Sequence, residues 1–249
     1  MFPKVLSSRK PLGMKMGMGM FIIKMIFVLR MVKSERVGGR EICSKKELAV
    51  LLSKMESFKG PKVIVEQYAT DPEIAAEVIW QACMNGDIGK VSVDLGCGTG
   101  ILGIGLLVLG AKRVYFVDFD KGALEIAKNN LEKVKSEYEV EGEAIFVCKD
   151  ARDFNENVDL VLQNPPFGVK IKHMDRVFLG KAFEIGEIVY SFHKSEGKRF
   201  VERFSQDNGF KITNVMDFKF PLKATMGYHT RRIRRIGVSC FRIEKSKLF

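Results

Sequence analysis

The stretch VDLGCGTGILGIG, residues 93–105, decides the fold, because it passes from an apolar segment through a glycine-rich turn into a second apolar segment. Glycines let a backbone turn tightly and approach a ligand, and the first turn of a helix offers amide groups to negative charge. The stretch therefore predicts a strand, a ligand-binding turn and a helix, in that order.

The regions that flank this turn alternate between short apolar segments and amphipathic ones. Strands are predicted at 91–95, 113–118, 143–148, 158–163 and 188–192, and helices at 101–109, 122–134, 178–186 and 195–205. Such alternation builds a parallel sheet covered on both faces. Two more strands, 210–220 and 233–243, have no helix between them and predict an antiparallel edge. We thus expect an α/β protein with a Rossmann-like, doubly wound, seven-stranded sheet whose last strand is antiparallel.

Two helices are predicted before the first strand. Ser44-Lys45-Lys46-Glu47 has the spacing of a capping box, and Thr70-Asp71-Pro72-Glu73 places a proline inside a first helical turn. No internal repeat or low-complexity linker follows residue 40. Residues 41–249 are therefore expected to form a single domain.

Residues 1–40 differ from the rest in composition, with nine Lys or Arg and one acidic residue. Their apolar run, 14–31, is interrupted by Lys24, and a membrane span needs roughly 20 apolar residues. Methionine recurs there at positions 14, 16, 18, 20, 25 and 31. We expect an N-terminal extension that is an over-called start, with the true start near Met31. An amphipathic surface segment and a membrane anchor are the alternatives.

The composition limits the class of protein. With 249 residues, 46% of them hydrophobic, the chain can bury the core of one sizeable domain. Five cysteines without a C-x-x-C pair, and three histidines, predict no metal site and indicate a reducing, cytoplasmic location. The net charge of +11 is uneven, because residues 190–249 hold 14 basic and five acidic residues.

The glycine-rich turn fits two classes of nucleotide site. The spacing of Gly98, Gly100 and Gly103 satisfies the fingerprint of a dinucleotide site. Preceded by Asp94 and Gly96, the same turn matches the loop of an S-adenosylmethionine-dependent methyltransferase. A glycine-rich turn without any ligand is the third alternative. Both nucleotide sites predict an acid at the end of the next strand, which binds the ribose hydroxyls.

Asp118, at the end of the strand predicted at 113–118, supplies that acid. Asp94 distinguishes between the two candidate ligands. Its carboxylate would repel the pyrophosphate of a dinucleotide but attract the ammonium and sulfonium of S-adenosylmethionine. We therefore favour S-adenosylmethionine as the cofactor. The residues expected to contact it are Asp94, Gly96, Gly98, Gly100 and Asp118.

A second unusual stretch is DLVLQNPPFG, residues 159–168, in which an apolar strand ends on an amide, two prolines and an aromatic ring. An ordinary tight turn is one interpretation. The carboxyl edge of a doubly wound sheet is, however, where ligands bind. The side-chain oxygen of Asn164 and the carbonyl of Pro165 can accept the two protons of an adenine amine and aim its lone pair at a methyl donor. Pro166 makes this segment rigid, and Phe167 can stack on the base.

The stretch MGYHTRRIRRIG, residues 226–237, places Arg231, Arg232, Arg234 and Arg235 beside Tyr228 and His229. A charge run of this kind is often a solvated turn. Arginines interleaved with rings at a sheet edge also suit phosphates and unstacked bases. We expect these arginines to bind RNA, with a target base that is unpaired or flipped.

Four motifs together carry a family resemblance. VIVEQYATDPEIAA, DLGCGTGILGIG, NPPFG and SFHKS occur in this order within residues 63–195. With them the chain, from about residue 44 to its end, resembles the methyltransferase-like protein 5 family of class I methyltransferases. The resemblance implies methyl transfer from S-adenosylmethionine to the N6 amine of one adenosine in small-subunit ribosomal RNA.

Further roles come from this resemblance alone. It implies that Gln67, Thr70, Thr99 and Ile101 contact the cofactor, and that Asp150 and Ala151 border its adenine. The family often has Cys where this chain has Thr99. His193 and Lys194 correspond to family positions at the end of the fifth strand, with a role in RNA binding or in the structure. A small zinc-binding activator protein is the implied partner.

The sequence therefore predicts a cytoplasmic RNA adenine N6-methyltransferase. A methyltransferase that modifies glutamine amides of a protein is one alternative, although it would not need the basic patch. An RNA-binding assembly factor that keeps the fold and the cofactor but turns over little is the other.

Overall fold

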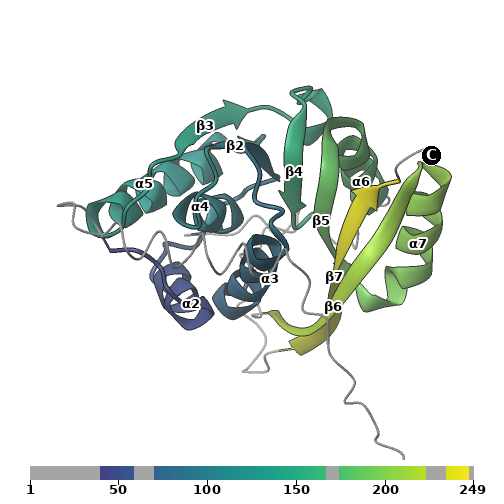
Figure 1. The fold of residues 1–249 in the computed structure, drawn as a ribbon, viewed down its shortest axis with the longest axis horizontal. Helices are drawn as coiled ribbons and strands as arrows, with labels where there is room; N and C mark the ends of the chain where they lie inside the picture. Colours follow the sequence, from purple (N-terminus) through teal and green to yellow (C-terminus); the bar gives the residue numbers. More distant parts are fainter. Residues whose placement is uncertain (1–39, 59–69, 167–173, 223–233, 247–249) are drawn as a thin grey trace, which may run out of the picture. The chain divides into compact units, whose positions relative to one another are not determined.

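The fold is taken from a computed structural model, which describes residues 40–58, 70–166, 174–222 and 234–246 (Figure 1). All of these residues belong to one compact unit, Val37–Phe249. Gln67, Phe167, Arg231 and Arg232 lie outside the described residues, as does the whole of 1–39. Within the described part of the chain, no helix is both long enough and apolar enough to cross a membrane.

A seven-stranded sheet forms the centre of this unit. Its strands are β1 (Val91–Leu95), β2 (Arg113–Asp118), β3 (Glu143–Cys148), β4 (Val158–Gln163), β5 (Gly186–Lys194), β6 (Phe210–Leu222) and β7 (Arg234–Lys245). They lie in the order β3-β2-β1-β4-β5-β7-β6, and β7 runs antiparallel to both of its neighbours. The predicted fold class is thus confirmed. The strand order reverses between β1 and β4, which is the position where doubly wound sheets bind ligands.

Helices cover both faces of the sheet (Figure 1). One face carries α2 (Lys45–Ser53), α3 (Pro72–Asn85), α4 (Ile101–Val108) and α5 (Lys121–Glu137), and the other carries α6 (Met174–Ile185) and α7 (Lys198–Asp207). Leu48, Ile79 and Leu106 represent the hydrophobic core on the first face. Leu179 and Val201 represent the core on the second face.

The start of α3 determines what the residue before it can do. Asp71 is the N-cap, and its Oδ1 accepts hydrogen bonds from the backbone amides of Glu73 and Ile74. Pro72 occupies the first turn, where no amide proton is needed. Because Asp71 caps the helix, the hydroxyl of Thr70 is available for a partner elsewhere in the molecule.

The structure moves several of the predicted boundaries, among them those of α5, α6, β5, α7, β6 and β7. β5 begins at Gly186, earlier than the expected 188–192, because this glycine packs closely on β4: an added Cβ would lie 2.5 Å from Cγ2 of Val161. The helix expected at 195–205 is divided into a short 3-10 turn, η3 (Ser195–Gly197), and α7. Gly197 lies at the junction between the two.

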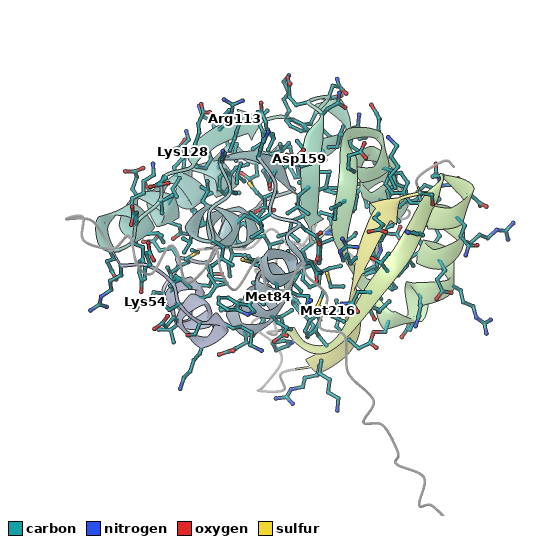
Figure 2. The ribbon with its side chains drawn as sticks, in the orientation of Figure 1. Lys54, Met84, Arg113, Lys128, Asp159 and Met216 are labelled. Atoms are coloured by element: carbon teal, nitrogen blue, oxygen red, sulfur yellow. The ribbon has the colours of Figure 1, made fainter. Side chains whose placement is uncertain are left out.

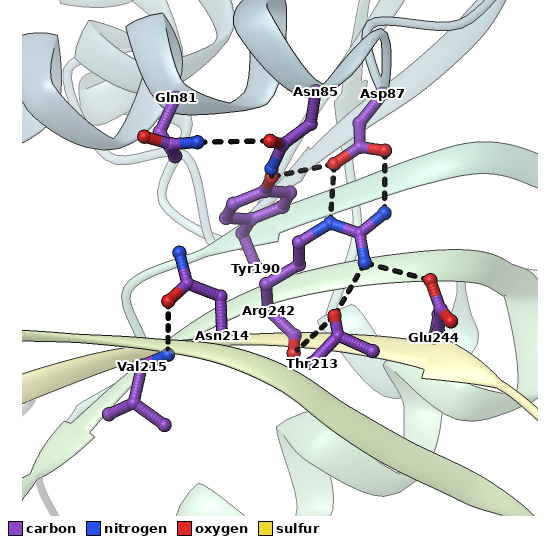
Figure 3. A network of polar contacts seen from close by, with 9 residues as sticks. All are labelled: Gln81, Asn85, Asp87, Tyr190, Thr213, Asn214, Val215, Arg242 and Glu244. Atoms are coloured by element: carbon purple, nitrogen blue, oxygen red, sulfur yellow. Dashed lines mark hydrogen bonds and ion pairs between the residues drawn. The ribbon is translucent and has the colours of Figure 1, made fainter. Parts of the chain in front are cut away.

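A polar network ties the end of α3 to β5 and β7 (Figure 3). Nε and Nη2 of Arg242 each donate to the carboxylate of Asp87 at 2.7 Å. The hydroxyl of Tyr190 donates to the same carboxylate at 2.6 Å and accepts from Nδ2 of Asn85. The side chains of Asp87 and Arg242 are only 4% and 13% exposed, so neither charge is well solvated. The pair therefore fixes α3 at the end opposite to Thr70.

We predict that Arg242→Met lowers the free energy of unfolding by about 3–5 kcal/mol, because it leaves the Asp87 carboxylate buried without its cation. Urea denaturation measures the change. Arg113→Met is the matched control: Arg113 pairs with Glu143 on the surface near β3 and should cost no more than about 1 kcal/mol (Figure 2). If both variants lost the same free energy of unfolding, the Asp87–Arg242 pair would not be a buried, stabilising ion pair.

Candidate active site

The glycine-rich turn follows β1 and leads into α4. Gly96, Gly98 and Gly100 all have left-handed backbones, with φ of 73°, 53° and 82°. The amides of Gly96 and Cys97 donate to the carbonyl of Val117 at 2.8 and 2.9 Å, which holds the turn against the end of β2. A side chain at Gly96 or Gly98 would also collide with neighbouring rings. The turn therefore requires glycine both for its conformation and for its packing.

Asp94 is a buried carboxylate in β1, just before this turn. Its Oδ2 accepts a hydrogen bond of 2.8 Å from the amide of Gly103, and its Oδ1 has no partner in the described structure. Burial raises the pKa of Asp94 to about 7, the Gly103 bond opposes that rise and the nearby Asp118 charge adds to it. A buried acceptor without a hydrogen-bond partner lowers the stability of the fold, and such groups concentrate at ligand sites.

Asp118 ends β2 and faces the same turn. Its Oδ2 accepts from the amide of Gly98 and its Oδ1 from the amide of Asp120, each at 2.8 Å. Burial raises its pKa, whereas these backbone hydrogen bonds lower it. The carboxylate therefore anchors the glycine-rich turn. Each of its oxygens has two lone pairs, so it can still accept a ligand hydroxyl.

Asn164 follows β4 and meets Thr70 across the site. Its Nδ2 donates to Oγ1 of Thr70 at 2.9 Å, over a separation of 94 residues. Its Oδ1 is buried and has no hydrogen-bond partner among the described residues. The bond to Thr70 orients the amide, so that the side chain presents an acceptor rather than a donor.

One pocket brings most of these residues together. The residues that line it are Phe58, Thr70, Asp94, Gly96, Cys97, Gly98, Thr99, Ile101, Leu102 and Asn164. Seven of them were expected from the sequence; Phe58, Cys97 and Leu102 were not. Of the other expected residues, Gly100, Asp118, Asp150, Ala151, Pro165 and Pro166 lie outside this lining, and Gln67 and Phe167 lie outside the described residues.

Asp150 has a local partner that the sequence reasoning did not consider. It is the N-cap of η2 (Ala151–Asp153), and its carboxylate binds the guanidinium of Arg152 through two hydrogen bonds of 2.9 and 2.7 Å. These bonds lower the pKa of Asp150. The carboxylate is therefore ionised and held in place just after β3.

Phe119 is a candidate that the sequence reasoning missed. It follows Asp118 directly and is 58% exposed, one of two large hydrophobic side chains that are exposed in the described structure. An exposed ring beside the acid that is expected to bind the ribose is well placed to stack on a base. Its position after the acidic residue was the available signal.

For His193, the geometry favours the structural one of the two expected roles. It is 3% exposed, its Nε2 lies 2.7 Å from Oγ of Ser191, and its ring packs edge-on against Phe241. Ser191 in turn accepts a hydrogen bond from Nε2 of Gln163, the residue before Asn164. The role of His193 is therefore structural. Lys194 is partly exposed at the end of β5.

No group of three or more His, Cys, Asp or Glu in the described ranges is arranged to hold a metal ion. The expected absence of a metal site concerns the whole chain and stays a prediction.

The chain matches the family model described as the methyltransferase small domain over residues 70–183. The crystal structure of PH1948 from Pyrococcus horikoshii, described as a candidate RNA methyltransferase, is 44% identical, with a TM-score of 0.75, and the match covers 82% of this chain and 99% of that one. The sheet order, the glycine-rich turn and the pocket therefore define a class I methyltransferase.

Two curated relatives narrow this class. An uncharacterized Methanocaldococcus jannaschii protein is 40% identical over 81% of this chain and 94% of its own. The rRNA N(6)-adenosine-methyltransferase METTL5 of Danio rerio is 31% identical over 79% of this chain and 97% of its own. The chain belongs to the METTL5 family.

We predict that His193 makes the protein less stable in acid. Burial lowers its pKa to about 4, with the Asp175 charge opposing that change. The unfolded chain, with an ordinary pKa near 6.5, then binds the proton more tightly, so stability falls as the pH drops from 6.5 towards 4. The contribution between pH 7 and pH 5 is about 2 kcal/mol.

Urea denaturation of the wild type and of His193→Gln at pH 7 and pH 5 measures this contribution. The wild type should lose about 2 kcal/mol more than the variant over that interval. An equal pH dependence in the two proteins would show that His193 is not held neutral by burial.

Proposed function

We propose that this chain transfers a methyl group from S-adenosylmethionine to the N6 amine of an adenosine in ribosomal RNA. The observation that carries the proposal is the unpartnered Oδ1 of Asn164, which is oriented by Thr70 and belongs to a residue that lines the pocket. Membership of the METTL5 family supports the same reaction, since its Danio rerio member is named for it.

The pocket has the groups that this cofactor requires. The unpartnered Oδ1 of Asp94 suits the ammonium of the methionine end, and a cation there would lower the pKa that burial has raised. Asp118 suits the ribose hydroxyls, and the exposed ring of Phe119 beside it suits the adenine. When bound, the cofactor supplies a methyl group on a positively charged sulfur.

Asn164 makes the adenine amine reactive. The lone pair of that amine is delocalised into the ring, which makes the nitrogen a weak nucleophile. Oδ1 of Asn164 and the carbonyl of Pro165 accept the two amine protons and hold the nitrogen pyramidal. The nitrogen would then take the methyl group that the bound cofactor supplies, and its extra proton would pass to water.

RNA is proposed to bind beside the carboxyl ends of β4 and β5. We call Lys194, Lys198, Arg199, Lys219 and Arg235 the basic rim. η3 lies between Lys194 and Lys198 and is attached to the sheet. Oγ of its Ser195 hydrogen-bonds Oγ of Ser239 in β7 at 2.9 Å. Ser195 also lies against Gly237, which is the strand partner of Lys219. None of the five forms an ion pair with a described residue. Unpaired cations are available to phosphates.

Three lysines of α5 differ in this respect. On α5, Lys128, Lys133 and Lys135 all pair with glutamates. Figure 2 shows Lys128 on the side of the sheet remote from β6 and β7. Arg235 is exposed, and the side chains of Arg231, Arg232 and Arg234 lie outside the description, so their contribution rests on the sequence pattern.

We also propose which RNA the protein modifies, which protein it binds and where in the cell it acts. Small-subunit ribosomal RNA follows from the family resemblance. A small zinc-binding activator protein is supported by β3, an edge strand with four partly buried apolar residues that a partner can extend. A cytoplasmic location agrees with described cysteines that form no disulfide.

We predict that Asn164→Ala retains cofactor affinity but lowers the rate of methyl transfer at least about 100-fold, because one preorganised group at the reacting atom is lost. The assay uses labelled S-adenosylmethionine and unmodified ribosomal RNA, followed by nucleoside analysis. Asn157→Ala, at an exposed asparagine, is the control and should be unchanged.

Wild-type incorporation by Asn164→Ala would overturn the role of this amide. Cofactor and RNA binding by the wild type without methyladenosine would favour the assembly factor, and methylation of a protein would favour the glutamine-amide reaction. Activity of the chain alone would show that an activator is dispensable.

We predict that replacing Lys198, Arg199, Lys219 and Arg235 by alanine weakens RNA binding and flattens its dependence on salt. Each lost phosphate contact should reduce the slope of log K against log salt by about 0.7–0.9. Replacement of Lys128, Lys133 and Lys135 is the control. An unchanged slope in the first variant would show that RNA does not bind the basic rim.

A further inference from the structure

A single buried asparagine joins three segments around the pocket. Asn130 lies on α5, facing away from solvent with 1% exposure. Its Oδ1 accepts from the amide of Glu56 at 2.8 Å, and its Nδ2 donates to the carbonyls of Glu56 and Thr99, both at 3.0 Å. We call these three hydrogen bonds the Asn130 clasp. It connects α5, the segment after α2 and the glycine-rich turn.

The bonds of the clasp determine the orientation of the amide. Both amide protons donate to carbonyl oxygens, and the side-chain oxygen accepts from an N–H, so a flipped amide would lose every bond. All three partners are backbone groups, so the clasp holds the path of the chain and not a particular side chain. The side chain of Glu56 adds a separate ion pair to Lys133 on the surface of α5.

The segment held by the clasp carries Phe58, two residues beyond Glu56. Phe58 lines the pocket and covers the glycine-rich turn, because a Cβ added to Gly98 would lie 3.0 Å from its Cζ. Thr99, held by the same asparagine, lines the pocket from the turn itself. The clasp therefore fastens an aromatic cover to the loop that it covers.

α5 contacts the turn at a second point, one helical turn earlier. A Cβ on Gly100 would lie 2.9 Å from Cβ of Ala127, so the helix packs directly on the loop. Ala127 and Asn130 are separated by three residues and lie on one side of the helix. The helix thus acts as a rigid backing, and Asn130 is the member of this contact that reaches beyond the turn to the segment after α2.

We propose that Asn130 is a positioning residue for cofactor binding, which holds Phe58 over the glycine-rich turn while remaining outside the pocket. This inference rests on the proposed function for the identity of the ligand and deepens it. The cofactor is bound beneath a ring whose position depends on the three hydrogen bonds of the clasp. Loss of the clasp leaves the catalytic amide and the basic rim intact, and so weakens the binding of the cofactor and not that of RNA.

The chain offers a matched pair of variants, because Asn129 is the exposed neighbour of Asn130. We predict that Asn130→Ala weakens the binding of S-adenosylhomocysteine at least tenfold, measured by calorimetry, and raises the KM for S-adenosylmethionine while kcat changes less than threefold. Asn129→Ala should bind as the wild type does. Asn130→Asp, which keeps the acceptor but cannot donate to the two carbonyls, should lose affinity as Asn130→Ala does.

A double-variant cycle with Phe58 separates positioning from a general loss of stability. If the clasp acts through Phe58, Asn130→Ala should weaken binding far less in a Phe58→Ala background than in the wild type. If Asn130→Ala does not fold, Phe58→Ala still tests the inference. This variant should stay folded and lose affinity for S-adenosylhomocysteine.

Three results would overturn the inference: wild-type affinity in a folded Asn130→Ala, additive losses in the cycle, or unchanged affinity in Phe58→Ala. Failure of the proposed function is distinguishable from all of these, because the wild type itself would then not bind S-adenosylhomocysteine.

Discussion

The hydrogen bond between Nδ2 of Asn164 and Oγ1 of Thr70 is the interaction on which the site depends. It directs the amide oxygen away from Thr70 and leaves it without a partner. Its geometry requires Asp71 to cap α3, so that the hydroxyl of Thr70 is not used by the helix. It also requires α3 to be fixed at its other end, which the buried pair of Asp87 and Arg242 achieves. A short helix held at both ends thus orients one acceptor.

The glycine-rich turn is stabilised by charged groups that are removed from solvent. Asp94 and Asp118 both use backbone amides as donors, one inside α4 and one in the turn. Burial raises the pKa of each, and a neighbouring carboxylate adds to the rise, that of Asp118 for Asp94 and that of Asp120 for Asp118. A cationic ligand relieves this cost, because an opposite charge nearby favours the ionised form. The electrostatics of these two carboxylates therefore favour a ligand with a positive end.

Charge outside the pocket is divided between the two ends of the sheet. Three of the four lysines of α5 pair with glutamates, whereas the basic rim near β7 has no acidic partner among described residues. Surface ion pairs contribute little to stability, so this difference bears on binding more than on folding. A polyanion is attracted to the basic rim, whose Lys194 ends β5 next to β4 and Asn164, and the paired cations of α5 do not compete for it.

Local sequence patterns were enough to predict the strands of the sheet and most of the residues that line the pocket. β1 to β4 begin and end where local apolar runs and flanking turns predicted, and seven of the ten residues that line the pocket were identified from the glycine-rich turn, the NPPF motif and the family resemblance. These signals are local, since strand periodicity, caps and glycine spacing act over a few residues.

Which polar groups meet could be learned only from the way distant segments pack. Thr70 and Asn164 are 94 residues apart, and Glu56 and Asn130 are 74 apart, so no local pattern connects them. The same holds for His193, whose burial depends on Phe241 in a strand that the chain forms later and inserts beside β5. Hydrogen bonds between distant segments depend on how whole elements pack, and that packing is specified by the core and not by the residues that form the bonds.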